Sequence, residues 1–185
     1  MQIEETALSG CFIVVFPLQR DLRGGFMRSF DREVFSRFGL KTTIDHLAEA
    51  FNPKRHTLRG MHFQASPLPD AKLVRCTKGS AFDVAVDLRP ASPTRGQWHG
   101  VRLTENDNKA LYIPEGFAHG YLTLSDNTTL TYQMFAPYRA ELQKGFRYND
   151  PIIRIDWPAP PALVGERDQD LPAFSQLWPQ YLVGT

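Results

Sequence analysis

The stretch KLVRCTKGSAFDVAVDLRP, residues 72–90, decides the fold class. It predicts two β-strands joined as a hairpin, because the pair Lys78-Gly79 suits a tight turn between two apolar runs. Side chains alternate along the second arm, which is the period of a strand. One face of that arm carries Phe82, Val84, Val86 and Leu88, and the other carries Ala81, Asp83, Ala85 and Asp87. We therefore expect one face to pack against a core and the other to combine small side chains with two carboxylates.

Similar short runs lie on both sides of this segment. CFIVVF (11–16) is expected to form a buried strand, and FMRSF (26–30) a second one after a turn at 21–25. Further strands are expected at 98–104, 109–114, 119–125 and 129–135. In the last of these runs, Leu130, Tyr132 and Met134 share a face. Roughly eight short strands favour an all-β protein, either a two-sheet jelly roll or a barrel.

A helix is expected in DREVFSRFG (31–39). Asp31 can cap its N-terminus and Gly39 can end it, while Phe35 and Phe38 lie three residues apart on one side. The proline-rich tail DPIIRIDWPAPP (150–161) is expected to wrap back across the body before a short helix near AFSQLW (173–178). The segment GERDQD (165–170) between them has the character of a charged surface loop.

Composition limits the possible functions. The 185 residues suffice for one domain spanning 1–185, with 42% hydrophobic and 22% charged residues. A net charge of +1 argues against broad electrostatic binding of nucleic acid, although a local phosphate pocket remains compatible with it. Two cysteines, Cys11 and Cys76, are too few for a disulfide framework and are expected to be reduced thiols in the core.

The N-terminal segment has two acids before a short apolar run, whereas a secretion signal begins with positive charge. The apolar runs are far shorter than the roughly 20 residues of a membrane span. The sequence therefore predicts a cytoplasmic protein without a membrane partner.

Polar residues are expected to converge at the mouth of such a jelly roll. The candidates for its interior are Arg59, His62, Lys72, Asp83, His119, Tyr132 and Tyr138. His62, in TLRGMHFQ (57–64), can be a structural core histidine, a metal ligand or a catalytic base. Metal-binding jelly rolls usually have a His-x-His pair, whereas this chain has HFQ, so no metal is expected.

Lys72 and Tyr132 each allow two interpretations. Lys72 is either a solvated strand end or a cavity cation paired with Asp83 that stabilises an oxyanion. Tyr132 is either a packed core residue or a proton donor. A histidine base, a cation for an enolate and a tyrosine acid suffice to invert carbon centres beside a ketone, and they require no cofactor.

Four motifs resemble one known family. LRGMHFQ (58–64), KLVRCTKGSAFDVAVDLRPASPTRGQW (72–98), LYIPEGFAHGYLTLSD (111–126) and FRYNDPIIRIDWP (146–158) are similar in order and spacing to the dTDP-4-dehydrorhamnose 3,5-epimerase family. The resemblance runs from about Phe16 to about Asp170. It implies a cupin-type jelly roll and a metal-free homodimer that exchanges N-terminal strands. Such a protein epimerises a nucleotide-linked 4-keto-6-deoxyhexose, most simply a dTDP-sugar, at the carbons flanking the ketone.

The resemblance also implies roles for individual residues. His62 matches the base, Asp168 the carboxylate that orients it, and Tyr132 the proton donor. Lys72 matches the residue that steadies the enolate, with Asp83 beside it. Arg59 and His119 match diphosphate contacts, Tyr138 the aromatic that stacks on the base, and Arg23 a contact from the partner chain. The other implied substrate-binding positions are Phe26, Arg28, Glu49, Gln143 and Arg167.

Four positions depart from the family pattern. Rhamnose-forming members commonly have glutamate at Arg28, glutamine and asparagine at Leu47 and Glu49, and glutamate at Gln143. All four are expected at substrate contacts, and none is a proton-transfer group. A different nucleotide, sugar or number of inverted carbons is therefore compatible with the sequence. Two alternatives are a nucleotide-sugar 3,4-ketoisomerase and a non-catalytic sugar-nucleotide or metal-binding cupin.

Overall fold

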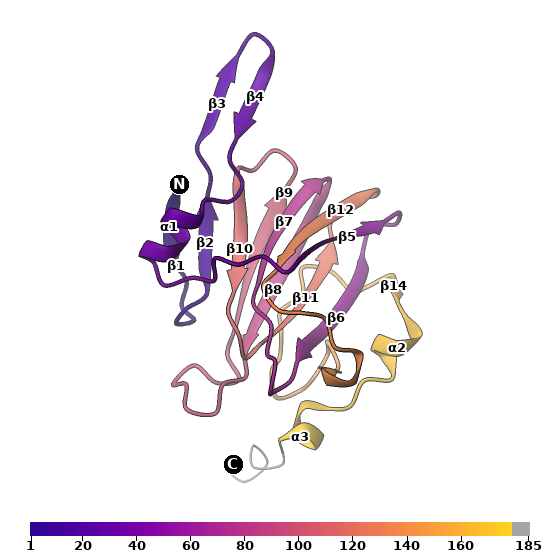
Figure 1. The fold of residues 1–185 in the computed structure, drawn as a ribbon. Helices are drawn as coiled ribbons and strands as arrows, with labels where there is room; N and C mark the ends of the chain where they lie inside the picture. Colours follow the sequence, from indigo (N-terminus) through magenta and orange to yellow (C-terminus); the bar gives the residue numbers. More distant parts are fainter. Residues whose placement is uncertain (179–185) are drawn as a thin grey trace.

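The computed structural model describes residues 1–178, and Figure 1 shows that most of them form two layered antiparallel sheets. The first sheet has the order β1 (Gln2–Glu5), β2 (Phe12–Val15), β10 (Lys109–Ile113), β7 (Lys72–Lys78), β12 (Thr128–Met134) and β5 (His46–Asn52). The second has the order β13 (Gln143–Gly145), β6 (Thr57–Gln64), β11 (Phe117–Thr123), β8 (Ser80–Asp87) and β9 (Trp98–Thr104). A short strand, β14 (Leu163–Val164), pairs in parallel with β6. This arrangement confirms the predicted all-β jelly roll.

The predicted hairpin at 72–90 is wrong in its pairing, although both strands exist. β7 lies in the first sheet between β10 and β12, while β8 lies in the second between β11 and β9. Gly79 forms the corner with a φ of +73°, and a Cβ there would lie 2.6 Å from Oγ of Ser125. The chain therefore changes sheet at this glycine instead of folding back on itself. A hairpin and a corner between two sheets have the same local sequence, a tight turn between two apolar runs. The strands that pair with β7 and β8 decide which of the two forms, and these strands are distant in the sequence.

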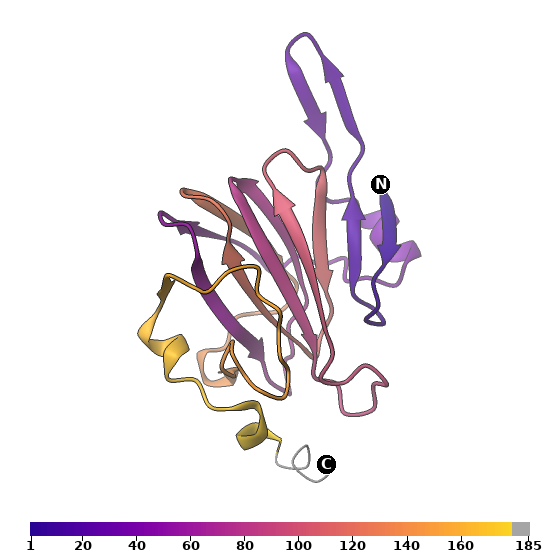
Figure 2. The same ribbon diagram turned by 180° about the vertical axis from the view of Figure 1, so that it is seen from behind.

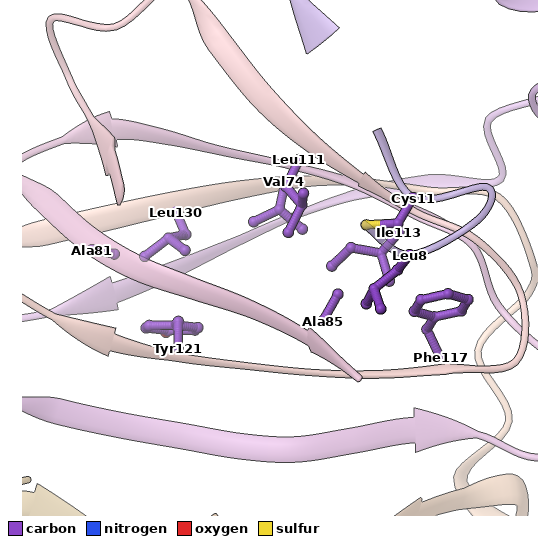
Figure 3. Close-up of a cluster of buried hydrophobic side chains, with 10 residues drawn as sticks. All are labelled: Leu8, Cys11, Val74, Ala81, Ala85, Leu111, Ile113, Phe117, Tyr121 and Leu130. Atoms are coloured by element: carbon purple, nitrogen blue, oxygen red, sulfur yellow. The ribbon is translucent and has the colours of Figure 1, made fainter. Parts of the chain in front are cut away.

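The core lies between the two sheets (Figure 3). Val74 and Leu130 of the first sheet meet Ala81, Ala85 and Tyr121 of the second there. β8 thus has the two faces that the alternation predicts. The face with the small residues and carboxylates is the one that points inward, between the sheets. Both of its carboxylates, Asp83 and Asp87, have fully buried side chains.

The outward face of β8 is covered by the C-terminal tail, which crosses the second sheet in Figure 2. Val84 and Val86 pack there in one cluster with Ile153, Phe174 and the partly buried Trp157. The tail ends its described part in α3 (Phe174–Leu177). The predicted wrapping and the short helix near 173–178 are both confirmed.

The helix predicted at 31–39 is α1 (Arg32–Arg37). The Asp31 side chain accepts hydrogen bonds from the backbone N–H groups of Glu33 and Val34, as expected for an N-cap. Phe35 is fully buried against the outer face of the first sheet, whereas Phe38 is 51% exposed. The spacing of the two phenylalanines placed both on one side of the helix, but only Phe35 is buried.

A hairpin of β3 (Leu18–Asp21) and β4 (Gly24–Met27) projects from the body in Figures 1 and 2. The strand predicted at 26–30 thus begins and ends earlier than expected. Leu22 and Phe26 on this hairpin are 108% and 71% exposed. Within residues 1–178, no helix is long and apolar enough to cross a membrane.

Candidate active site

A cavity of about 450 Å³ opens between the two sheets. β5, β7 and β12 form one wall, and β6, β11 and β13 form the other. Of the residues expected in the interior, Arg59, His62, Lys72, His119, Tyr132 and Tyr138 all line it. Gln143 lines it as well.

Strand register explains the wall made by the first sheet. Met134 on β12 lies directly opposite both His46 on β5 and Lys72 on β7. Two residues earlier, Tyr132 lies opposite Ala48 and Val74. Because directly opposed residues share a face, Lys72 and Tyr132 both belong to the inward face of this sheet. The shared face predicted for Tyr132 and Met134 is therefore confirmed.

His62 occupies the opposite wall and is hydrogen-bonded to Asp168. Nε2 of His62 lies 2.6 Å from Oδ1 of Asp168, and Oδ2 of Asp168 accepts the N–H of Gly60 at 2.9 Å. Burial alone raises the pKa of Asp168, but these two hydrogen bonds lower it below its ordinary value overall. The carboxylate therefore stays ionised beside the imidazole.

Asp168 also corrects an expectation. The segment 165–170 is not a charged surface loop throughout, because Glu166–Gln169 form the helix α2 and Asp168 points inward with only 10% of its side chain exposed. Nothing in the local sequence distinguishes Asp168 from Glu166 or Asp170. Only the resemblance to a family pointed to it.

Gly60 allows His62 to lie close to β11. Its φ is +119°, and a Cβ at this position would lie 2.6 Å from Cα of Gly120. A side chain at Gly60 would therefore push apart the two strands that carry His62 and His119.

The expected pairing of Lys72 with Asp83 is wrong. Nζ of Lys72 lies 3.5 Å from Oδ2 of Asp70, and the Lys72 side chain is 12% exposed. Oδ1 of Asp83 instead lies 2.8 Å from Nε2 of His119. Asp70 follows a loop and shows no strand periodicity, which is why the sequence did not identify it as the partner.

Tyr132 lines the cavity from β12. Its ring meets that of His119 edge-on with a centroid distance of 5.8 Å. Its pKa is raised well above its ordinary value, first because burial disfavours the phenolate and then because Tyr121 and Asp83 oppose negative charge. The hydroxyl is therefore protonated across the neutral range and can act as a proton donor.

Asn52 joins two of the cavity residues. Its Oδ1 accepts Nε–H of Arg59 at 3.0 Å and the hydroxyl of Tyr121 at 3.1 Å. Asn52 is fully buried and its amide nitrogen donates to the backbone of Ala50 and Thr128. It therefore orients the guanidinium of Arg59 toward the cavity. Its sequence signal, a polar residue at the end of a strand, is too common to predict this role.

Gln64 fixes the opposite side of the opening. Its Oε1 accepts Nε2–H of Gln143 at 2.8 Å, and its own amide donates to the backbone of Leu68 and Pro137. Gln143 therefore has its amide nitrogen engaged, which leaves its oxygen to face a ligand. Tyr138 lies at the rim and is 58% exposed.

Five of the expected substrate-binding residues do not line the cavity in this single chain. Glu49 lies opposite Thr131, one register position from the inward Tyr132, so it faces the outer side of the first sheet. Arg167 is exposed on α2. Arg28 pairs with Asp31 at 2.8 Å beside α1. Arg23 and Phe26 lie on the projecting hairpin, where the Arg23 side chain is 90% exposed.

Leu47, like Glu49, does not occupy the expected substrate contact in this single chain. Leu47 is 71% exposed on the same outer face as Glu49. The inward residues of β5 that line the cavity are His46, Ala48 and Ala50. A shift of one residue in a strand exchanges its two faces, and sequence motifs do not specify that register.

The described residues contain no group of three or more His, Cys, Asp or Glu side chains placed to hold a metal ion. Nε2 of His62 and Nε2 of His119 are each bonded to a carboxylate instead. The fold and this site define a jelly-roll protein with an acid–base cavity between its two sheets.

A sequence model of the dTDP-4-dehydrorhamnose 3,5-epimerase family matches residues 5–176. The curated dTDP-4-dehydrorhamnose 3,5-epimerase of Methanothermobacter thermautotrophicus is 40% identical over 169 residues, which cover 90% of each chain. The chain belongs to the dTDP-4-dehydrorhamnose 3,5-epimerase family.

Two solved structures of relatives contain dTDP-sugars. The dTDP-6-deoxy-D-glucose-3,5-epimerase of Legionella pneumophila, in complex with dTDP-4-keto-L-rhamnose, is 32% identical with a TM-score of 0.88, covering 93% of this chain and 92% of that one. ChmJ of Streptomyces bikiniensis, a 3'-monoepimerase in complex with dTDP-quinovose, is 28% identical with a TM-score of 0.88, covering 97% and 91%. Relatives of this fold thus include an enzyme named for epimerisation at two carbons and one named for epimerisation at a single carbon.

Proposed function

We propose that this protein is an isomerase that epimerises a dTDP-linked 4-keto-6-deoxyhexose at the carbons flanking its ketone, as in deoxysugar biosynthesis. One observation supports the proposal most directly: His62 and Tyr132 lie on opposite walls of one cavity. Lys72 lines the same cavity from the wall that carries Tyr132. Family membership supplies the substrate class.

The base is His62. Asp168 holds its imidazole at 2.6 Å and stabilises the positive charge that the ring gains when it accepts a proton. A ketone acidifies the hydrogens on its neighbouring carbons, so a neutral histidine is strong enough if the resulting oxyanion is stabilised.

Lys72 stabilises that oxyanion. Its ammonium is largely buried, and a charge in such a site acts more strongly than it does in water. Tyr132 then returns a proton from the opposite side. Removal from one face and return to the other inverts the carbon, and the sugar retains its ketone throughout.

Arg59 and His119 are placed to contact the diphosphate, Tyr138 to cover the base at the rim, and Gln143 to contact the sugar. Asp83 acts through His119, whose ring it holds. These roles follow from family membership together with the lining of the cavity.

The functional form is a homodimer in which the N-terminal segments are exchanged. The projecting hairpin supports this, because Leu22 and Phe26 are exposed on it and Arg23 has no contact with the cavity of its own chain. On this arrangement Arg23 and Phe26 reach the partner's cavity.

Incubation with dTDP-4-keto-6-deoxyglucose in heavy water tests the activity. Deuterium at both C3 and C5 identifies a double epimerase, and deuterium at one carbon a single epimerase. NMR of the product also reports whether the ketone has moved, which would indicate a ketoisomerase. Absence of exchange with this substrate would contradict the proposed function.

A further inference from the structure

Asp70 is a buried carboxylate in the cavity wall that the proposed reaction leaves without a role. It lies between β6 and β7, and its side chain is only 4% exposed. One oxygen, Oδ2, lies 3.5 Å from Nζ of Lys72. The other, Oδ1, is buried and accepts no hydrogen bond from residues 1–178. Because buried polar atoms are nearly always hydrogen-bonded, this oxygen indicates a donor that the chain itself does not supply.

The surroundings of Asp70 restrict what that donor can be. Lys72 lies beside Asp70. His46 lies two strands away at the same level of the sheet, since Met134 is opposite both His46 and Lys72, and its Nδ1 lies 2.8 Å from Oδ2 of Asp45. Burial raises the pKa of Asp70, and Lys72, the backbone N–H of Phe135 and His46 oppose this rise. The Asp70 carboxylate can accept a hydrogen bond and the neighbouring Lys72 ammonium can donate one. This pair matches a ligand in which a hydroxyl lies next to an oxygen that accepts hydrogen bonds.

A 4-keto-6-deoxyhexose has this pair of groups. Its ketone oxygen is on C4, and a hydroxyl is on the neighbouring C3. If Lys72 donates to the ketone oxygen, the adjacent Asp70 is placed to accept from the hydroxyl beside it. The carbon on the other side, C5, carries a methyl group and the ring oxygen, neither of which can donate a hydrogen bond.

We propose that Oδ1 of Asp70 binds the C3 hydroxyl of the sugar and makes the site selective for 3-hydroxy sugars. This inference rests on the proposed function and extends it from a substrate class to a particular contact. Asp70 is then a substrate-binding residue, and it also fixes the sugar ring relative to Lys72.

The test measures dissociation constants for three ligands: dTDP-quinovose, its 3-deoxy analogue and dTDP. These ligands lack the ketone and do not react. A hydrogen bond to a charged group changes affinity by about tenfold or more. We expect the wild-type protein to bind dTDP-quinovose at least about tenfold more tightly than the 3-deoxy analogue. Asp70→Ala and Asp70→Ser should bind both sugars alike, and all proteins should bind dTDP alike.

A matched control is Glu33→Gln, which removes an exposed carboxylate that pairs with Arg37 on α1, outside the cavity. It should retain the wild-type preference for the 3-hydroxyl. Equal weakening of all three ligands in the Asp70 variants would show a structural role and overturn the inference, as would retention of the preference. A wild-type protein that binds dTDP-quinovose but does not epimerise the keto sugar would contradict the proposed function without affecting this contact.

Discussion

Nε2 of His62 on β6 lies 2.6 Å from Oδ1 of Asp168 on α2, although 106 residues separate them in the chain. The second oxygen of Asp168 accepts the Gly60 N–H, so the carboxylate is fixed by the same strand that carries the histidine. An anchored carboxylate selects one tautomer of the imidazole and stabilises its protonated form. This contact therefore fixes the orientation of the His62 imidazole on the cavity wall.

We expect Asp168→Asn to lower kcat by about 10²- to 10⁴-fold, because the amide cannot stabilise the imidazolium. Deuterium incorporation into the keto sugar measures the loss. Asp170→Asn, which changes an exposed acid two residues away, should leave kcat unchanged. A kcat for Asp168→Asn close to that of the wild type would contradict the role of this pair.

Tyr132→Phe is expected to separate exchange from inversion. The phenyl ring keeps the edge-on contact with His119, but the hydroxyl that returns the proton is lost. His62 can still remove and return a proton on its own face, so deuterium should enter the substrate while little inverted sugar forms.

NMR of the recovered sugar distinguishes deuterated substrate from epimerised product. The control is Tyr112→Phe, since the Tyr112 hydroxyl accepts the Lys41 N–H in a cluster away from the cavity. Inverted product at the wild-type rate from Tyr132→Phe would exclude Tyr132 as the proton donor.

The elements that the sequence predicted well depend on neighbouring residues. The cap at Asp31 begins α1 through contacts within three residues, and alternation along 80–87 indicates the two faces of one strand. The elements that it missed depend on distant partners. Whether β7 and β8 form a hairpin is decided by β10, β12, β9 and β11, which no local pattern specifies.

The same distinction applies to the site. Tyr132 lies in a regular strand, so its inward direction follows from periodicity once one face is known. His62 does not follow periodicity, because Arg59 and His62 both line the cavity three residues apart, where the pairing of β6 with β11 is irregular. Asp168 and Asp70 lie outside the long strands, where periodicity gives no direction. Glu49 is a different error, because the resemblance placed it at a substrate contact whereas it faces away from the cavity, one residue out of register with Ala48.

Asp87 is expected to stabilise the fold and not to take part in the reaction. Its buried Oδ2 accepts Nη2–H of Arg89 and the hydroxyls of Ser92 and Thr94. Burial alone raises the pKa of Asp87, but these hydrogen bonds lower it from 3.8 to about 2. Because the pKa is depressed in the folded state, the stabilisation is present above about pH 4 and is lost as the pH falls through about 2.

Asp87→Asn should therefore lower the free energy of unfolding at pH 7 by about 2 kcal/mol. Urea unfolding between pH 7 and pH 2 checks the prediction, since the difference from the wild type should shrink toward the acid end. Asp156→Asn, at an exposed position in the tail, should show no such difference. A difference that does not vary with pH would exclude the charge of Asp87 as its cause.

The exchange of N-terminal segments can be tested with two inactive variants. Arg23→Ala should lose substrate binding, although Arg23 lies on the projecting hairpin and does not line the cavity of its own chain. His62→Ala should lose proton transfer. If Arg23 acts in the partner's cavity, a mixed dimer of the two variants contains one site with both residues intact.

Mixing the two variants under conditions that exchange subunits should therefore restore activity to about a quarter of the wild-type value, because half of the dimers are mixed and each has one complete site. Deuterium incorporation measures the recovery. The control mixes His62→Ala with Lys72→Ala; both of these residues line the same chain's cavity, so each site of a mixed dimer lacks one of them and no activity should return. An Arg23 mixture that stays as inactive as the control would mean that Arg23 acts within its own chain and that the hairpin does not reach the partner's site.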